Sequence, residues 1–229
     1  MSKMRKFKFL WLILLVLILS ACGVFGSKTF NEDGFEASPF SFEHPLGWEV
    51  LYTEQETWAF QDASEIKIGD DGNLTGFFAG TVGVGFHVLM PEFINEQFGT
   101  TEIAPIEMLQ QYEQRVTEFR QTHESRNDEE SSESTGLKSF LQEPIYILNN
   151  VTESPTSYQI CDKNVVGMKA QEYTTMSFSE TPIRETWRFL TVMDDQVIEI
   201  VGLHDMNDAE RFEEIFESII CSLEVHESD

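Results

Sequence analysis

The last two strand patterns of the chain constrain its fold more than any other feature. Residues 184–193 and 196–203 are both rich in apolar and β-branched side chains, and only Asp194 and Asp195 separate them. Two strand patterns joined by a two-residue turn predict an antiparallel hairpin. We therefore expect the rest of the chain to supply further antiparallel strands and the helices that cover them.

Shorter strand patterns precede this hairpin. Apolar and polar residues alternate over the segments 40–44 and 48–52, which is typical of half-buried strands. Further strand patterns occupy residues 57–61, 65–68, 77–90, 140–148, 157–161 and 168–178. The sheet is therefore expected to contain strands from most of the chain.

Two amphipathic stretches interrupt the strands. Pro105 is a good first-turn residue and opens a helix expected to end near residue 121. Residues 207–210 have the form of a capping box that starts a second helix. Together these patterns predict one α+β domain over 39–225, in which helices flank an antiparallel sheet.

The first 21 residues have the composition of an export signal. Basic residues at positions 3, 5, 6 and 8 precede an apolar core over 9–19, as in a secretory signal peptide. A membrane-spanning anchor is the alternative, but it needs roughly 20 apolar residues. Residues 22–38 are short of branched apolar residues and are expected to form a flexible tether.

The residues Leu19-Ser20-Ala21-Cys22 resemble the lipobox of bacterial lipoproteins. The resemblance implies that lipid such as palmitate is attached to Cys22 and anchors the protein in the bacterial cell membrane. It also implies that the domain works on the extracytoplasmic face, on the periplasmic side or at the cell surface.

The chain is strongly acidic. Forty Asp and Glu residues against 15 Lys and Arg residues give a formal net charge of −25, which repels phosphate groups and anionic lipid headgroups. This charge argues against a nucleic-acid partner. Residues 122–135 contain no large apolar side chain and are expected to form an acidic, solvated loop insertion.

Three cysteines become two once Cys22 is assigned to lipid. Cys161 and Cys221 are then an even pair in an oxidising compartment, and one disulfide is the simplest expectation. A redox or metal pair is the weaker alternative because the chain has no Cys-x-x-Cys spacing.

The histidines show no spacing typical of a metal site on a helix. His44 belongs to a turn motif and is interpreted as structural. An enzyme acting on a small extracytoplasmic substrate is an alternative function, with His87, His204 and nearby carboxylates as its acid and base groups. No catalytic constellation, metal site or cofactor is otherwise predicted.

Two further motifs have competing interpretations. The motif Asp70-Asp71-Gly72-Asn73 indicates a hairpin turn rather than a calcium loop, because it lacks alternating oxygen ligands and a distal bidentate Glu. Trp48, Trp58 and Trp187 are expected in the core rather than in a ligand pocket.

Residues 40–50, Phe-Ser-Phe-Glu-His-Pro-Leu-Gly-Trp-Glu-Val, resemble the opening of the PsbP-like superfamily, in which an aromatic strand runs into Tyr/His-Pro-x-Gly-Trp. The close is similar as well, with a strand after Gly167, a hairpin over 187–201 and a final helix that ends in residues 217–222. The resemblance implies an α/β/α sandwich and a non-catalytic binding or assembly module. The acidic insertion and the pair of cysteines are not features of the family core.

These expectations converge on a lipid-anchored binding or assembly module whose protein or small-molecule partner the sequence does not name. A structural envelope lipoprotein is a third possibility. In that case the acidic loop 122–135 would be a solvated spacer or a cation-binding surface.

Overall fold

The computed structural model describes residues 26–31, 38–52, 56–62, 66–68, 74–77, 81–124, 148–172, 184–206 and 209–226. Several sequence predictions lie outside these residues. They are the signal peptide with Cys22, the turn 70–73, nearly all of the acidic loop 122–135, the strand pattern before residue 148 and the capping residues 207–208.

The main sheet has seven antiparallel strands in the order β3-β4-β7-β11-β10-β9-β8. Along the chain these strands are β3 (Glu49–Tyr52), β4 (Glu56–Phe60), β7 (Gly83–Leu89), β8 (Leu148–Ile160), β9 (Lys163–Glu172), β10 (Arg184–Met193) and β11 (Gln196–His204). The predicted hairpin, β10 with β11, therefore lies near the centre of the sheet.

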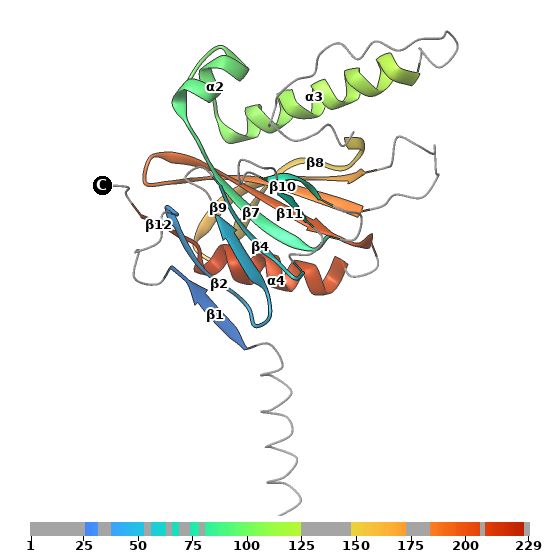
Figure 1. Ribbon diagram of the computed structural model, residues 1–229. Coiled ribbons are helices and arrows are strands. Elements are labelled where there is room, and N and C mark those ends of the chain that lie inside the picture. Colours follow the sequence, from blue (N-terminus) through green and yellow to red (C-terminus); the bar gives the residue numbers. More distant parts are fainter. Residues whose placement is uncertain are drawn as a thin grey trace, which may run out of the picture.

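Smaller elements complete the described chain. A three-stranded sheet contains β1 (Ser27–Phe30), β2 (Phe40–Pro45) and β12 (Glu224–Val225), and β5 (Ile66–Ile68) pairs with β6 (Leu74–Phe77). The helices are α2 (Pro91–Phe98), α3 (Pro105–Glu124) and α4 (Ala209–Ser222). Helices α2 and α3 lie on one side of the main sheet and α4 lies on the other (Figure 1). The predicted α+β class, an antiparallel sheet flanked by helices, is confirmed.

The structure differs from the sequence predictions at several boundaries. Strand β1 falls within the expected tether 22–38, because Ser27–Phe30 pairs in register with β2 and the Phe30 ring packs 5.5 Å from Phe42. Helix α2 was not predicted, although Pro91 begins it and Gly99 ends it in the left-handed conformation. Of the predicted strand 77–90, β7 contains only Gly83–Leu89, and Phe77 is the last residue of β6.

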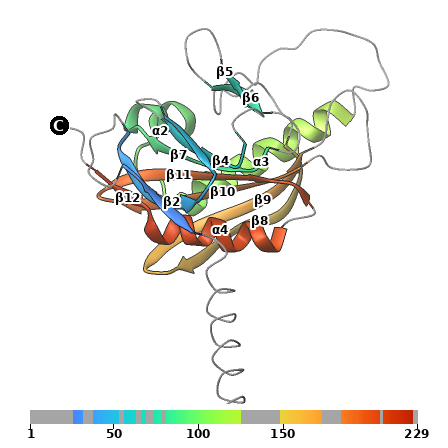
Figure 2. The same ribbon diagram turned by 60° about the horizontal axis from the view of Figure 1, so that its bottom comes forward.

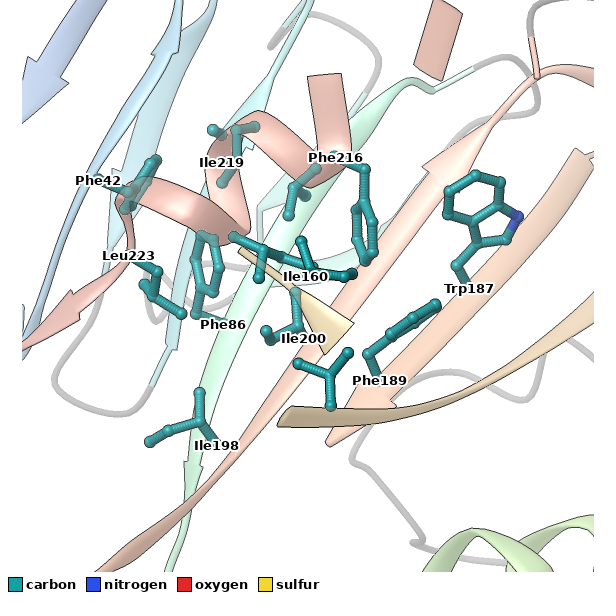
Figure 3. Close-up of a cluster of buried hydrophobic side chains, with 14 of the residues drawn as sticks. Phe42, Phe86, Ile160, Trp187, Phe189, Ile198, Ile200, Phe216, Ile219 and Leu223 are labelled. Carbon is teal, nitrogen blue, oxygen red and sulfur yellow. The ribbon is translucent and has the colours of Figure 1, made fainter. Parts of the chain in front are cut away.

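The face of the sheet toward α4 carries the largest hydrophobic cluster (Figure 3). The Phe216 ring lies 5.3 Å from Trp187 and 5.1 Å from Phe189, measured between ring centroids. Gly202 of β11 allows this approach, since a Cβ there would lie 2.9 Å from both Phe212 and Phe216. The apolar residues that alternate along the strands and the apolar stripe of α4 thus form one core.

The opposite face combines apolar packing with buried ion pairs. Helix α3 places Met108, Leu109 and Tyr112 in a cluster with residues of β9 and β10. On this face Arg188 pairs with Glu199 at 2.5 Å, and the Arg188 guanidinium lies 4.6 Å from the centre of the Tyr112 ring. Because these charges are buried, removal of either partner would leave an uncompensated charge in the core and destabilise the fold.

Cys161 and Cys221, the pair predicted from the sequence, form a disulfide with a Cα–Cα separation of 5.6 Å. Cys161 is in the turn between β8 and β9, and Cys221 is in the last turn of α4. The bridge therefore ties the tip of the β8–β9 hairpin to the end of α4. Among the described helices, none is long and apolar enough to cross a membrane.

Candidate functional site

The main sheet opens at one end, between two hairpins. Pairing of β9 with β10 stops at Val165 and Thr191, whereas β10 stays paired with β11 as far as Met193 and Gln196. Strand β9 likewise stays paired with β8 as far as Lys163. In Figure 2 the gold tip of β8–β9 lies beside α4, apart from the orange tip of β10–β11. We call this opening the split.

A groove of about 570 Å³ follows the split. Its apolar surface comes from Pro105 at the start of α3, Val165 and Val166 of β9, and Leu190 and Val192 of β10. Val192 is 54% exposed, which is unusual for a large apolar side chain in a central strand. Its polar surface comes from Ser157, Tyr158, Asp162, Lys163, Asn164 and Thr191.

Two contacts fix the strand ends on either side of the split. The Thr191 hydroxyl donates to the Asn164 carbonyl at 2.9 Å, and Thr191 itself is buried. This hydrogen bond joins β10 to β9 at the end of their ladder, beside the last pair, Val165 with Thr191. The disulfide acts from the other side, because it fixes the tip of β8–β9 to α4.

The charges around the groove are predominantly acidic. Lys163 is only 14% exposed and donates to the carbonyl of Cys221 at 3.0 Å, which directs its ammonium group toward the end of α4. Asp162 is exposed, and hydrogen bonds from its own backbone N–H and from Lys163 lower the pKa of its carboxyl group, so it stays ionised near neutral pH. Asp194 and Asp195 are exposed at the neighbouring tip and both have positive φ, of 48° and 62°.

Tyr158 lines the same groove as a neutral group. Burial raises the pKa of its hydroxyl well above the usual value, and the hydrogen bond to Glu153 and the charge of that carboxylate add to the effect. The hydroxyl donates to Glu153, so it serves as a fixed dipole near neutral pH. The Tyr158 ring lies 5.4 Å from the Phe189 ring, between centroids, so the hydroxyl is on the face of the sheet toward α4.

His87 is on the face of the sheet toward α3. Its Nε2 atom lies 3.4 Å from Glu56, and its ring contacts Trp58 edge-on at 5.9 Å between centroids. The residue directly across the β7–β11 ladder is Glu199, so the two side chains share that face.

His204 is on the opposite face, and it is fully buried. Its Nδ1 atom lies 2.7 Å from the carbonyl of Asp205 and its Nε2 atom lies 3.1 Å from Glu185. Both partners are acceptors, so the arrangement is satisfied only when both ring nitrogens carry a proton. His204 also stacks on Phe212, with 4.6 Å between ring centroids.

The two histidines proposed as an acid–base pair therefore do not form one site. Glu199, which is opposite His87, and His204 are five positions apart on β11. Because this offset is odd, their side chains point to opposite faces and the sheet lies between the two imidazoles. The enzyme hypothesis built on His87 with His204 was wrong in this respect, because the sequence did not fix the register that puts them on opposite faces.

The remaining predicted residues have structural surroundings. Trp58 and Trp187 are 2% and 3% exposed, and Trp48 packs partly buried against the core, as expected. His44 is buried, and this burial is the main reason that the pKa of its imidazole is lowered. Its Nδ1 atom lies 3.1 Å from the carbonyl of Pro45. Within the part of the chain that the structure describes, no group of three or more His, Cys, Asp or Glu side chains is placed to hold a metal ion.

Sequence reasoning missed the groove. Its signal is a mismatch in strand length, since the ladder between β9 and β10 ends two residues before β10 does. The pattern over 184–193 predicted β10 correctly, but it contains nothing to show where a neighbour stops pairing. Only the exposed apolar position at Val192 marks the opening.

No protein-family model matches the chain, and no curated protein matches its sequence. Solved structures that are similar to the chain were found. The solution structure of cyanobacterial PsbP (CyanoP) from Synechocystis sp. PCC 6803 is similar with a TM-score of 0.43 and 9% identity, over 89% of this chain and 96% of that one. The Ran-binding protein Mog1p of Saccharomyces cerevisiae has a TM-score of 0.44 and 9% identity, over 88% and 96%.

Proposed function

We propose that this protein is a lipid-anchored, extracytoplasmic binding module whose ligand lies in the groove between the β8–β9 and β10–β11 hairpins. The observation that carries the proposal is the groove itself. Its volume of about 570 Å³ falls within the range of about 300 to 1,000 Å³ that is usual for ligand pockets. It also joins an apolar wall to a few polar groups, as binding sites do.

The groove is built into the fold rather than formed by a loose loop. It is lined by the ends of paired strands, and the disulfide and the Lys163 hydrogen bond both hold the β8–β9 tip to α4. A preformed site loses less conformational freedom on binding than a flexible one. This rigidity supports a role in binding.

The lipid anchor is part of the same proposal and is supported by residues 19–22, which resemble a lipobox. Replacing Cys22→Ser should release the protein from the membrane fraction or leave its precursor unprocessed. The measurement is fractionation with an immunoblot against the parent protein. Unchanged membrane partition together with unchanged processing would contradict the anchor.

Position-specific photo-crosslinking in intact cells tests the groove. A photoreactive amino acid at Val192, which is exposed in the groove, should give a discrete adduct. The matched control is the same amino acid at Glu217, an exposed residue of α4 away from the groove. Equal adducts at both positions, or none at Val192, would argue against binding in the groove.

A further inference from the structure

We infer that the turn between β2 and β3, residues 45–48, lies against the membrane in which the protein is anchored. The inference rests on the proposed lipid anchor and adds the orientation of the domain. Three features support it: the short chain between Cys22 and the first strand, the hydrogen bond that joins this segment to the turn, and the exposed side chain of Leu46.

The chain between the anchor and the fold is short. Gly26 follows Cys22 by four positions, and β1 begins at the next residue, Ser27. An extended chain spans at most about 3.6 Å per residue, so the Cα atom of Gly26 lies within about 14 Å of the Cα atom of Cys22. Lipid on Cys22 would hold that residue at the bilayer surface. The start of β1 would therefore stay close to the membrane.

Gly26 is in turn joined to the turn between β2 and β3. Its carbonyl accepts a hydrogen bond from the Leu46 N–H at 2.8 Å, and the next residue, Ser27, pairs with Pro45 in the β1–β2 ladder. The Leu46 side chain lies over Gly26, where a Cβ atom would overlap with Leu46 Cδ1. The side of the domain nearest the anchor is therefore the side that presents Leu46.

The turn has the chemistry of a membrane contact. It consists of Pro45, Leu46, Gly47 and Trp48 and carries no charge. Leu46 is 64% exposed, more than any other large apolar side chain in the described part of the chain. Trp48 is half-buried, and tryptophan is enriched where proteins meet the membrane surface. Burial of a leucine side chain favours a contact by about tenfold or more, and the anchor supplies the proximity.

Acidic residues confine the contact to the turn. Glu43 and Glu49 lie on either side of it and are both exposed. Anionic headgroups would repel these carboxylates. The domain therefore rests on the membrane through Leu46 and does not insert further.

The contact leaves the groove free for its ligand. Glu49, next to the turn, pairs with Phe60, which pairs with Gly83 and through it with Leu203 of β11. The turn is thus at the Leu203 end of β11, whereas Gln196 is at the hairpin tip beside the groove. Seven positions separate the two residues, which is about 23 Å along a strand. Figure 1 also shows β1 and β2 on the opposite side of the domain from α2 and α3.

A fluorescent label tests the inference on the full-length, lipidated protein in phosphatidylcholine vesicles. Cys161 and Cys221 form a disulfide, so Leu46→Cys supplies a single free thiol for an environment-sensitive dye. Val192→Cys is the matched control, because Val192 is also largely exposed but lies in the groove. Lipid with a nitroxide on its headgroup should quench the dye at position 46 by about half or more and leave the dye at position 192 nearly unchanged. Iodide in the water should show the reverse order.

A second measurement needs no substitution. Phosphatidylcholine with a photoreactive diazirine near its headgroup should form adducts with the parent protein within residues 45–48. Mass spectrometry of the digested protein locates these adducts. Equal quenching by the nitroxide lipid at positions 46 and 192 would overturn the inference, as would adducts on the domain that are absent from residues 45–48.

Flotation of the vesicles separates this inference from the proposed anchor. The parent should float with the vesicles, and Cys22→Ser protein without residues 1–21 should stay behind. If the parent floats but the turn shows no lipid contact, the orientation is wrong and the anchor stands. If the parent does not float, or the Cys22→Ser protein floats equally, the anchor fails and this inference fails with it.

Discussion

Removing the disulfide should lower the free energy of unfolding by about 4 kcal/mol. The bridge between Cys161 and Cys221 spans a sequence separation of 60 residues, and in the chain-entropy model a loop of that length gives about 4 kcal/mol. The variant is Cys161→Ala with Cys221→Ala. For a domain of this size, the loss corresponds to a melting temperature lower by about 8 to 16 °C.

The assay is urea unfolding followed by tryptophan fluorescence, since Trp58 and Trp187 are both buried. The parent protein unfolded with a reducing agent serves as a second measurement, because it removes the same link without a substitution. Both should lose about the same stability. A loss below about 1 kcal/mol in both, or two free thiols in the denatured, unreduced parent, would refute the argument.

Two further predictions concern the core face toward α4. Phe216→Ala should cost about 3 to 5 kcal/mol in urea unfolding, because the ring is 1% exposed and contacts Trp187 and Phe189; a loss below about 1 kcal/mol would contradict this packing. Burial is the largest single effect on the pKa of the Glu185 carboxyl group, and it raises that pKa. The hydrogen bonds from His204 and Trp187, together with the nearby positive charges, outweigh burial, so the pKa is below the usual value. Glu185 therefore stabilises the fold above its ordinary pKa of 4.5, and this contribution is lost as the pH falls through its lower folded pKa. Urea unfolding between pH 7 and pH 3 should show a smaller pH dependence for Glu185→Gln, and an unchanged slope would contradict this.

The sequence predicted those elements that local patterns determine. The hairpin of β10 and β11 was found because apolar alternation and a two-residue acidic turn occur together, and α4 was found from its apolar stripe. The disulfide pair followed from counting cysteines. Helix α2 was missed because it is short and buries only Ile94, although its start and stop signals are present.

The candidate site depends on relations between strands that no local pattern contains. His87 and His204 were placed on strands correctly, but only the β7–β11 register shows that they lie on opposite faces. The groove at Val192 depends on where β9 stops pairing with β10. Both relations are long-range, so no local sequence pattern predicts them.

Hydrogen–deuterium exchange of the full-length protein tests the central claim, that ligand binds in the split, most directly. The measurement compares the free protein with the protein saturated by a partner identified through crosslinking at Val192. Binding in the groove predicts new protection over residues 162–166 and 190–193, with no change in β3 (Glu49–Tyr52), the opposite edge of the sheet. Protection at β3 or α4, with none on either side of the split, would contradict the claim.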